Sequence, residues 1–469
     1  MASSPSSAAP RWDARTWSLL VVLCGVLFLD GLDVSMVGMA LPSIRSDLGL
    51  STSQLQWVVS GYVLGYGGLL LLGGRAADLL GRRRVLIAGL SVFVVASAVG
   101  GLVEDGTLLV ITRILKGMSA AFTAPAGLSI ITTTFEEGPN RNRALAYYTA
   151  TGASGFSLGL VFGGLLTELG WRWTFLLPVP FALAILVLAR RVIPRDRIVP
   201  GVRRRYDFAG AVTITGAMLL LVRTVVDAPE IGWASATTLA SFALVAGLLA
   251  AFVAIELRTP QPLVRLGILR SGPLVRANLG MATMFAAYVG FQFVGTLYLQ
   301  TMHGWSPVET ALAFLPGGIL VALGSPRIGP LVDRYGTARI IAVGMLAFVV
   351  GYALFLRFDA SPSFVGLMLP TMLLIGFGFA LCFPTQNIQA TAGVADHEQG
   401  LASGLVNTSF QLGGAVGLAI VSAVVSGETS LDAFRPAIAV VTGFSALGLL
   451  VALAGLIPAT RDRLARAEA

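Results

Sequence analysis

Ionisable and reactive side chains are scarce in this sequence of 469 residues. Charged residues make up 12% of it, and there are two cysteines, two histidines and one lysine. Cys24 and Cys382 lie far apart in apolar runs, and the only histidines are His303 and His397, so we expect no disulfide framework and no metal site. Lys116 belongs to no Gly-x-x-x-x-Gly-Lys-Ser/Thr sequence, which excludes that nucleotide-binding loop. We therefore expect no cofactor.

Long apolar runs fill most of the chain instead. Hydrophobic residues account for 55% of it, and the mean hydropathy is +0.82. The runs are about 20 residues long, enough for a helix to cross a hydrocarbon core of roughly 30 Å. This pattern predicts an all-α polytopic membrane protein with 14 transmembrane helices. Its apolar blocks begin near Trp17, Gln54, Val85, Thr107, Arg143, Trp173, Asp207, Ala234, Leu274, Pro307, Ala338, Ser363, Leu401 and Asp432.

The net charge of +8 is explained by where the arginines lie. If the N-terminus is cytoplasmic, most basic residues fall in inner loops and tails, and a basic linker at Arg190–Arg205 stands out. Such a positive-inside bias predicts that both termini are cytoplasmic, and no nucleic-acid partner is needed. The tail Met1–Thr16 precedes a run longer than a signal-peptide core, which predicts an uncleaved first span. The outer loops then hold only Arg45, Arg172, Arg223, Arg357 and Arg435.

One short motif occurs twice. Residues 74–81, which include Asp78, and residues 329–336, which include Asp333, both read Gly-x-x-x-Asp-x-x-Gly between apolar runs. The copies lie 255 positions apart (329 minus 74). A duplicated polar loop between hydrophobic helices indicates a duplicated membrane half, which is typical of transporters.

The repeat extends beyond the loop. Gly117 is followed eight residues later by Pro125, and Gly376 is followed eight residues later by Pro384. A half of six spans needs roughly 190–200 residues, so about 60 residues are extra. The predicted organisation is a cytoplasmic tail (1–16), a six-helix bundle (17–192), a basic linker (193–206), two inserted transmembrane helices (207–256), a second linker (257–273), a six-helix bundle (274–457) and a cytoplasmic tail (458–469).

These motifs resemble those of the major facilitator superfamily, specifically its fourteen-span drug:proton antiporters. Residues 74–84 are similar to the superfamily's motif A, and residues 113–117 to the fourth-span motif B. Residues 32–42 are similar to the first-span motif, with Gly38 where Asn is usual, and residues 155–164 to the antiporter motif, with Leu160 where Pro is expected. The resemblance implies a major facilitator fold and proton-coupled export of drug-like or antibiotic molecules by alternating access.

Two carboxylates lie inside the first predicted span. Asp30 and Asp33 are three residues apart and so share a helical face. A charge at this depth normally faces a cavity or a partner, and Arg113 enters the fourth span at a similar depth. Our hypothesis is that Asp33 exchanges a proton and Arg113 stabilises its charged form. A purely structural pair is the alternative, and Asp30 is a second protonation site, a cation-binding group or a residue without a coupling role.

Other motif residues have implied or possible roles. The resemblance implies a cytoplasmic latch that holds the two halves together, formed by Gly74, Asp78, Gly81, Arg82 and Asp333. It also implies an antiporter-type glycine ladder formed by Gly155, Gly159, Gly163 and Gly164. Buried amides either bridge helices or face water. The candidates for a substrate cavity are Gln56, Gln292, Tyr288, Gln386, Asn387 and Asn407.

The sequence leaves alternatives to export. An uptake symporter or facilitator for a small organic solute would use the same fold. A membrane enzyme or a receptor is disfavoured, because no cluster of catalytic groups and no sizeable loop domain is present, and Glu309 is interpreted as an exposed loop carboxylate. We expect a multi-pass cell-membrane protein of bacterial origin and not an enzyme. Its partners would be membrane lipid and an amphipathic or cationic small molecule, with the proton gradient as energy source and no obligate protein partner.

Overall fold

The computed structural model is all-helical. It describes residues 12–135, 139–195, 207–259, 262, 264–357, 363–394, 399–425 and 431–456. Each of the predicted apolar blocks coincides with a helix. Within the described residues, 11 helices are long and apolar enough to cross a membrane, and two shorter apolar segments lie at Ser154–Leu169 and Ala209–Val225.

The helices of the first part follow one another with short connections. They are α1 (Ala14–Leu48), α2 (Thr52–Leu80), α3 (Arg82–Gly100), α4 (Gly106–Thr134), α5 (Pro139–Leu169), α6 (Trp173–Leu176) and α7 (Pro178–Val192). Next come α8 (Phe208–Ile231), α9 (Ala236–Arg258) and the 3-10 turn η1 (Leu266–Arg270).

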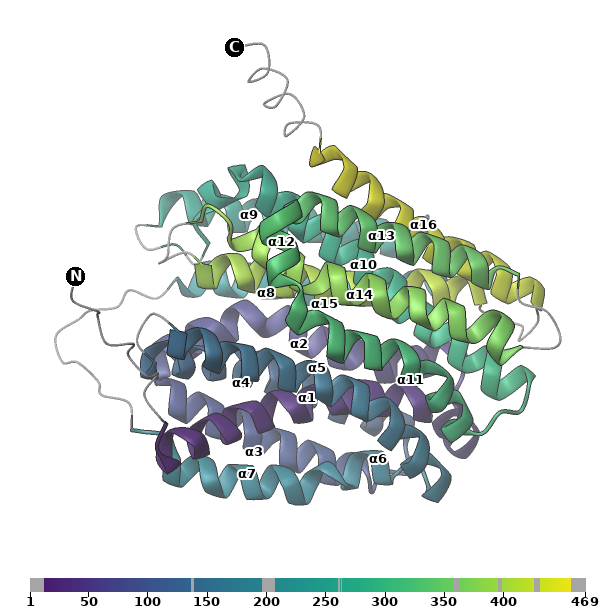
Figure 1. The fold of residues 1–469 in the computed structure, drawn as a ribbon, viewed down its shortest axis with the longest axis horizontal. Helices are drawn as coiled ribbons and strands as arrows, with labels where there is room; N and C mark the ends of the chain where they lie inside the picture. The colour runs from purple at the N-terminus through teal and green to yellow at the C-terminus, as the bar shows by residue number, and fades with distance from the viewer. Residues whose placement is uncertain are drawn as a thin grey trace, which may run out of the picture.

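The last part has the same plan. Its elements are α10 (Gly272–Leu297), η2 (Tyr298–Met302), α11 (Pro307–Gly324), η3 (Ser325–Arg327), α12 (Gly329–Tyr335), α13 (Thr337–Phe355), η4 (Phe364–Met368), α14 (Leu369–Thr391), α15 (Gln399–Val425) and α16 (Leu431–Ala454). Figure 1 shows α1–α7 gathered on one side of the molecule and α10–α16 on the other. We call these two groups the N-half and the C-half.

Corresponding helices pack in corresponding pairs. In the N-half, α1 packs on α5, α2 and α3 pack on α4, and α3 packs on α7. In the C-half, α10 packs on α15, α11 and α13 pack on α14, and α13 packs on α16. The halves meet along two seams, α2 with α15 and α5 with α11 (Figure 1). The internal repeat in the sequence is therefore also a repeat of helix packing.

The doubled motif forms a helix–glycine–helix turn in both halves, and the expectation of a polar loop is corrected here. Gly74 and Asp78 lie in the last two turns of α2, and Asp333 lies in α12. The chain breaks only at Gly81 (φ 98°) and Gly336 (φ 79°), which precede α3 and α13. A positive φ is accessible to glycine at little cost, so one residue is enough to end one helix and start the next.

The two ends of the bundle differ in charge. One end carries the turns at Gly81 and Gly336 with exposed Arg84, Arg334 and Arg339, and we call it the basic end. The other, the distal end, carries the turn between α1 and α2. There, Ser51 and Gln54 form a capping box at the start of α2. Glu309 is exposed and completes a similar capping box with Ser306 at α11, which confirms that it is a surface carboxylate.

Among the described residues, the largest apolar cluster joins the halves toward the distal end. The largest cluster of buried side chains combines Val37, Leu41 and Leu160 of the N-half with Phe291 and Phe314 of the C-half. The cluster at the basic end of the N-half, by contrast, contains residues of that half alone. The halves are therefore packed together at one end of the bundle.

The two inserted helices lie against one seam. α8 packs on both α2 and α15, and α9 packs mainly on α8. Val222 and Val225 of α8 share an apolar cluster with Val63 of α2 and with Ala415 and Ala419 of α15. The expected tail at 458–469, most of the linker at 193–206, His397 and the side chain of Asp78 lie outside the described part of the chain.

Candidate functional site

A buried carboxylate with two cations lies in the middle of the N-half. Asp33 of α1 is 0% exposed, and Arg113 of α4 is 1% exposed. Arg113 Nη1 donates to Asp33 Oδ2, so the ion pair expected from their similar depths is present. Arg113 Nε donates to the backbone carbonyl of Val58 at 3.0 Å, and its guanidinium lies 4.8 Å from the ring centre of Tyr62. α2 therefore fixes the orientation of the arginine toward α1.

Lys116 is the second cation, and reasoning from the sequence missed it as a site residue. Its ammonium donates to the other oxygen of Asp33, Oδ1, and the residue is 0% exposed. The same Nζ lies 4.9 Å from the ring centres of Phe93 on α3 and Phe175 on α6. The spacing held a signal, because Lys116 follows Arg113 by three residues and so lies on the same face of α4.

Asp30 completes the group one turn before Asp33. It is 6% exposed and lies near Thr123 of α4. Among the described residues, nothing hydrogen-bonds its Oδ2. Asp30 interacts electrostatically with both Asp33 and Lys116. The site thus holds two acidic and two basic side chains in a buried part of the helix bundle.

Charge balance limits what this site can do. With both acids ionised, their charges match those of Arg113 and Lys116. An uncompensated buried charge is costly, and breaking a buried pair by removing one partner costs about 3–5 kcal/mol. Asp33 forms ion pairs with both cations, so its loss would leave both without this counter-ion. A proton that binds or leaves here changes the electrostatics of five helices, since α1, α2, α3, α4 and α6 all contribute contacts.

The glycine ladder of α5 sets how closely that helix approaches α1. A Cβ atom at Gly159 would lie 2.6 Å from the carbonyl oxygen of Leu32, and one at Gly163 would lie 2.8 Å from the Cα of Met36. A Cβ atom at Gly155 would likewise clash with the carbonyl oxygen of Phe28. The ladder therefore serves close packing, as small residues do between membrane helices.

Gly164, the fourth glycine of the predicted set, faces the other half. A Cβ atom there would lie 2.8 Å from both the Cβ of Ala311 and the carbonyl oxygen of Pro307, on α11. Two further contacts join the halves toward the distal end. Gln300 Nε2 donates to the carbonyl oxygen of Met39 at 3.3 Å, and Gln292 lies against Gly38, where an added Cβ would be 3.2 Å from its Nε2.

The predicted latch residues lie at the basic end. Gly74 is half-buried, and a Cβ there would make only ordinary contact with Pro125, at 3.7 Å. Arg82 begins α3 and is half-buried, whereas Asp333 is exposed. The side chain of Asp78 lies outside the description. Its role remains a prediction.

The predicted amides do not gather in one place. Gln56 and Gln386 are fully buried, and in the described part of the chain no hydrogen bond reaches Gln56 Nε2 or either polar atom of Gln386. Asn387 and Asn407 are half-buried, and each donates to the carbonyl oxygen four residues earlier on its own helix. A cavity role for the set stays a prediction.

Aromatic rings, by contrast, form a continuous group on the inner side of the C-half. Tyr288 lies 5.1 Å from Phe379 and 5.8 Å from Phe156 of the N-half, between ring centres. Phe285 and Phe410 are stacked at 3.5 Å. Most of these rings are half-buried rather than sealed in the core. We call the group the aromatic cluster: Phe156, Phe285, Tyr288, Phe379, Phe383 and Phe410.

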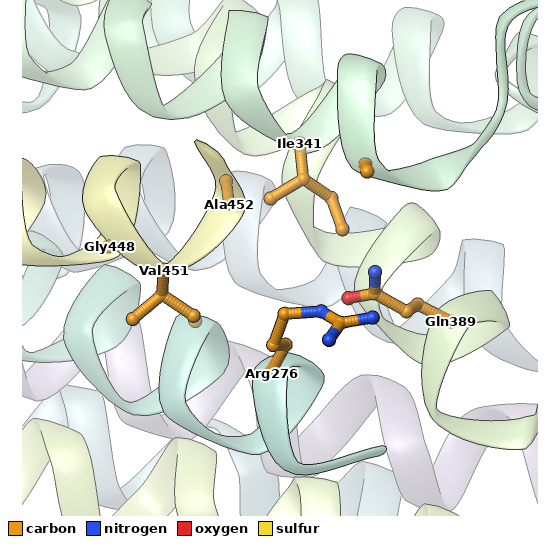
Figure 2. A pocket seen from close by; sticks show the side chains of 8 residues that line it. Arg276, Ile341, Gln389, Gly448, Val451 and Ala452 are labelled. Carbon is orange, nitrogen blue, oxygen red and sulfur yellow. The ribbon is translucent and has the colours of Figure 1, made fainter. Parts of the chain in front are cut away.

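A small pocket at the basic end of the C-half is a separate feature. Its volume is about 10 Å³, no more than a single water molecule needs. In Figure 2 the guanidinium of Arg276 points toward the amide of Gln389, with Ile341, Val451 and Ala452 around them. The pocket is too small for an organic solute.

Known proteins similar to this chain are membrane transporters and resistance proteins. It is 38% identical over 433 residues to the puromycin resistance protein pur8 of Streptomyces alboniger, covering 91% of this chain and 85% of that protein. It is 38% identical over 416 residues to the cephamycin export protein CmcT of Amycolatopsis lactamdurans, covering 88% and 85%.

Solved structures agree on the fold. The POT family transporter PepTSo matches with a TM-score of 0.68 at 16% sequence identity, over 97% of this chain and 99% of that one. A D-xylose-proton symporter matches with a TM-score of 0.67 at 17% identity, over 94% and 97%. The family model described as "Major Facilitator Superfamily" matches residues 23–418. The chain, with its paired halves and buried charges, belongs to the major facilitator superfamily.

Proposed function

We propose that this multi-pass cell-membrane protein exports drug-like or antibiotic small molecules in exchange for protons. The buried group formed by Asp33, Arg113, Lys116 and Asp30 is the observation that carries the proposal, because ionisable groups at membrane depth are expensive and mark ion pathways. The resistance and export proteins that resemble the chain support a drug-like substrate and outward transport. No cofactor enters this mechanism, and the proton gradient drives it.

In this proposal the chain spans the membrane 14 times with both termini in the cytoplasm, and each half is a six-helix bundle. The arginines at the basic end support this orientation. Because the largest cluster of the described residues joins the halves toward the distal end, whereas the cluster at the basic end of the N-half contains no C-half residue, we infer a state whose interior opens to the cytoplasm. Alternating access then requires the contacts of Gly164 and Gln292 across the halves to separate. Asp78, with Asp333 as its counterpart, would latch the opposite, cytoplasm-closed state.

The aromatic cluster is the proposed substrate surface. Half-buried rings at the meeting point of the halves offer flat apolar faces, and the hydroxyl of Tyr288 adds a polar group. Aromatic faces also attract cations. This composition supports an amphipathic or cationic substrate with a ring system. In this arrangement the N-half binds and releases the proton, and the C-half supplies most of the substrate-binding surface.

Flux measurements in everted membrane vesicles test the proposal. With puromycin as the probe, we expect accumulation when the vesicle interior is acidified and its loss when a protonophore collapses the gradient. An uptake symporter would instead accumulate its solute when the exterior is acidic. Puromycin and a cephamycin that both fail to respond to either gradient would contradict proton-driven drug export.

Variants of Asp33 test its part in coupling. We expect Asp33→Asn to abolish gradient-driven transport and to retain substrate exchange between equal concentrations. Since this change leaves two cations without a counter-ion, the double variant Asp33→Asn with Lys116→Gln restores charge balance and guards against misfolding. Asp47→Asn is the matched control, because its side chain is 46% exposed in a surface pair with Arg172. Normal gradient-driven transport by Asp33→Asn would remove Asp33 from the coupling site.

A further inference from the structure

We propose that Asp30 carries the exchangeable proton and that Lys116 is a switching cation, which pairs with Asp33 while Asp30 is protonated and turns to Asp30 when it ionises. The role in transport rests on the proposed function, whereas the protonation states do not. The two acids differ in their partners. Both oxygens of Asp33 accept from cations, while Asp30 Oδ2 meets no hydrogen-bonding group in the described part of the chain.

Asp33 is the poorer place for a mobile proton. Protonating it would take the counter-ion from Arg113 and Lys116 together, in surroundings that are fully buried. Protonating Asp30 breaks no ion pair. A neutral Asp30 also removes the repulsion between two carboxylates that share one face of α1.

Lys116 is the group able to move between the acids. It interacts electrostatically with Asp30 as well as with Asp33. Its ammonium is a compact charge on a flexible stem, whereas the guanidinium of Arg113 is planar and is also held by Val58 and Tyr62. Arg113 therefore stays with Asp33. In the described part of the chain no backbone carbonyl accepts a hydrogen bond from Lys116, and besides Asp33 its ammonium contacts only two aromatic rings, so its flexible stem can turn it toward Asp30.

The proton and charge balance is simple. When the O–H bond of Asp30 breaks, the proton passes to water on the side to which the interior is open. The site then changes from one net positive charge to none, with Arg113 paired to Asp33 and Lys116 paired to Asp30. Lys116 remains an ammonium throughout. Rebinding of a proton to Asp30 returns Lys116 to Asp33 and restores the contact that the structure shows.

In the described part of the chain, the other ionisable groups around Asp30 offer no competing counter-ion. They are hydroxyls of tyrosines on α2 and α5, and a phenol is neutral at ordinary pH. Among the described residues, the ionisable groups that interact with Asp30, besides Asp33 and Lys116, are Tyr62, Tyr66 and Tyr148.

Infrared difference spectroscopy of the whole purified protein in lipid tests the protonation states without any substrate. At neutral pH we expect the carbonyl band of one protonated buried carboxylic acid, which disappears as the pH rises. The band should be absent in Asp30→Asn and present in the charge-balanced variant Asp33→Asn with Lys116→Gln. A band that survives in Asp30→Asn, or that is lost only when Asp33 is changed, would overturn the assignment.

Lys116 variants test the switch. In Lys116→Gln the ionised Asp30 has no cation to meet, so the band should persist to a pH higher by at least about one unit, and gradient-driven puromycin transport should fall about tenfold. Lys116→Arg keeps the charge and should restore part of both. Arg223→Gln removes one positive charge from a side chain that is 72% exposed and should change neither. An unshifted band in Lys116→Gln would refute the switch, whereas a shifted band in a protein that transports no drug would leave it standing and refute the proposed export.

Discussion

Trp57 of α2 donates its indole N–H to the carboxylate of Asp227 on α8, at 3.2 Å. This bond joins an inserted helix to the N-half, and the other carboxylate oxygen receives Arg223 of the same helix at 3.4 Å. The contact of α8 with α15 in the shared cluster is apolar. Helices can slide past each other more easily across an apolar contact than across one fixed by a directed hydrogen bond. We therefore expect α8 to move with α2 when the halves rearrange.

Loss of the Trp57 bond should weaken the attachment of α8. We expect Trp57→Phe to lower the stability of the purified protein by about 1 kcal/mol, in the range measured for hydrogen bonds between membrane helices. A thermal melt in detergent measures this. Arg223→Gln should melt close to the unaltered protein, because its pair with Asp227 is solvent-exposed and weak. Equal melting of Trp57→Phe and the unaltered protein would show that packing alone holds α8.

Alanine in the glycine ladder should disturb the packing of α5 on α1. Gly159→Ala forces a methyl group against the backbone of Leu32, and Gly417→Ala does the same against Ala286 where α15 packs on α10. We expect each to cost about 1–3 kcal/mol and to lower the yield of monodisperse protein. Gly247→Ala in α9 is the control, since no atom lies within 4 Å of its added Cβ. A ladder variant as stable as this control would argue against the close approach.

A disulfide between the halves should stop transport. The variant Gly164→Cys with Ala311→Cys places two thiols where an added Cβ and the Cβ of Ala311 are 2.8 Å apart, so the helices need to give by about 1 Å for good geometry. We expect oxidation to trap the distal end closed and reduction to restore transport. Cys24 and Cys382 are buried and should not interfere. Each single cysteine variant is the control, and full transport by the cross-linked protein would show that this contact need not open.

The two copies of the doubled motif should respond unequally to mutation. Asp333 is exposed at the basic end, so Asp333→Asn should change the transport rate by less than about twofold, as surface substitutions usually do. We expect Asp78→Asn to cause the greater loss, because its copy of the motif continues into Arg82–Arg84. Rates measured in the same vesicles compare the two. Equal losses would indicate a symmetric latch.

Much of this architecture follows from the sequence because hydrophobic period and depth are local properties. The apolar blocks coincide with the helices, and matching depths predicted that Asp33 and Arg113 would meet. The glycine that precedes a proline by eight residues in each half, Gly117 or Gly376, also has the same structural role in both halves. Gly117 packs against the backbone of Tyr62 on α2, and Gly376 packs against Gly317 on α11, in equivalent places of the two halves.

Other features depend on how whole helices turn and dock, which no short pattern specifies. From the sequence, Lys116 is a lysine outside a nucleotide-binding loop and a member of the motif at residues 113–117, and neither identifies it as a partner of Asp33, although its spacing from Arg113 puts both on one face of α4. The ring of Tyr62 over Arg113 depends on the rotation of α2. The position of α8 against α2 and α15 depends on complementary surfaces of all three helices. For the amides, the choice between helix bridges and a cavity depends on the rotation of each helix, which the sequence does not specify.

The burial of Lys116 has a practical consequence. It carries the only side-chain amine in the chain, and it is 0% exposed between two aromatic rings and a carboxylate. An amine-reactive acylating reagent can modify this side chain only when the site opens to water. The rate of acylation at this single position would therefore report how often the interior of the N-half becomes wet, without a label or an engineered residue.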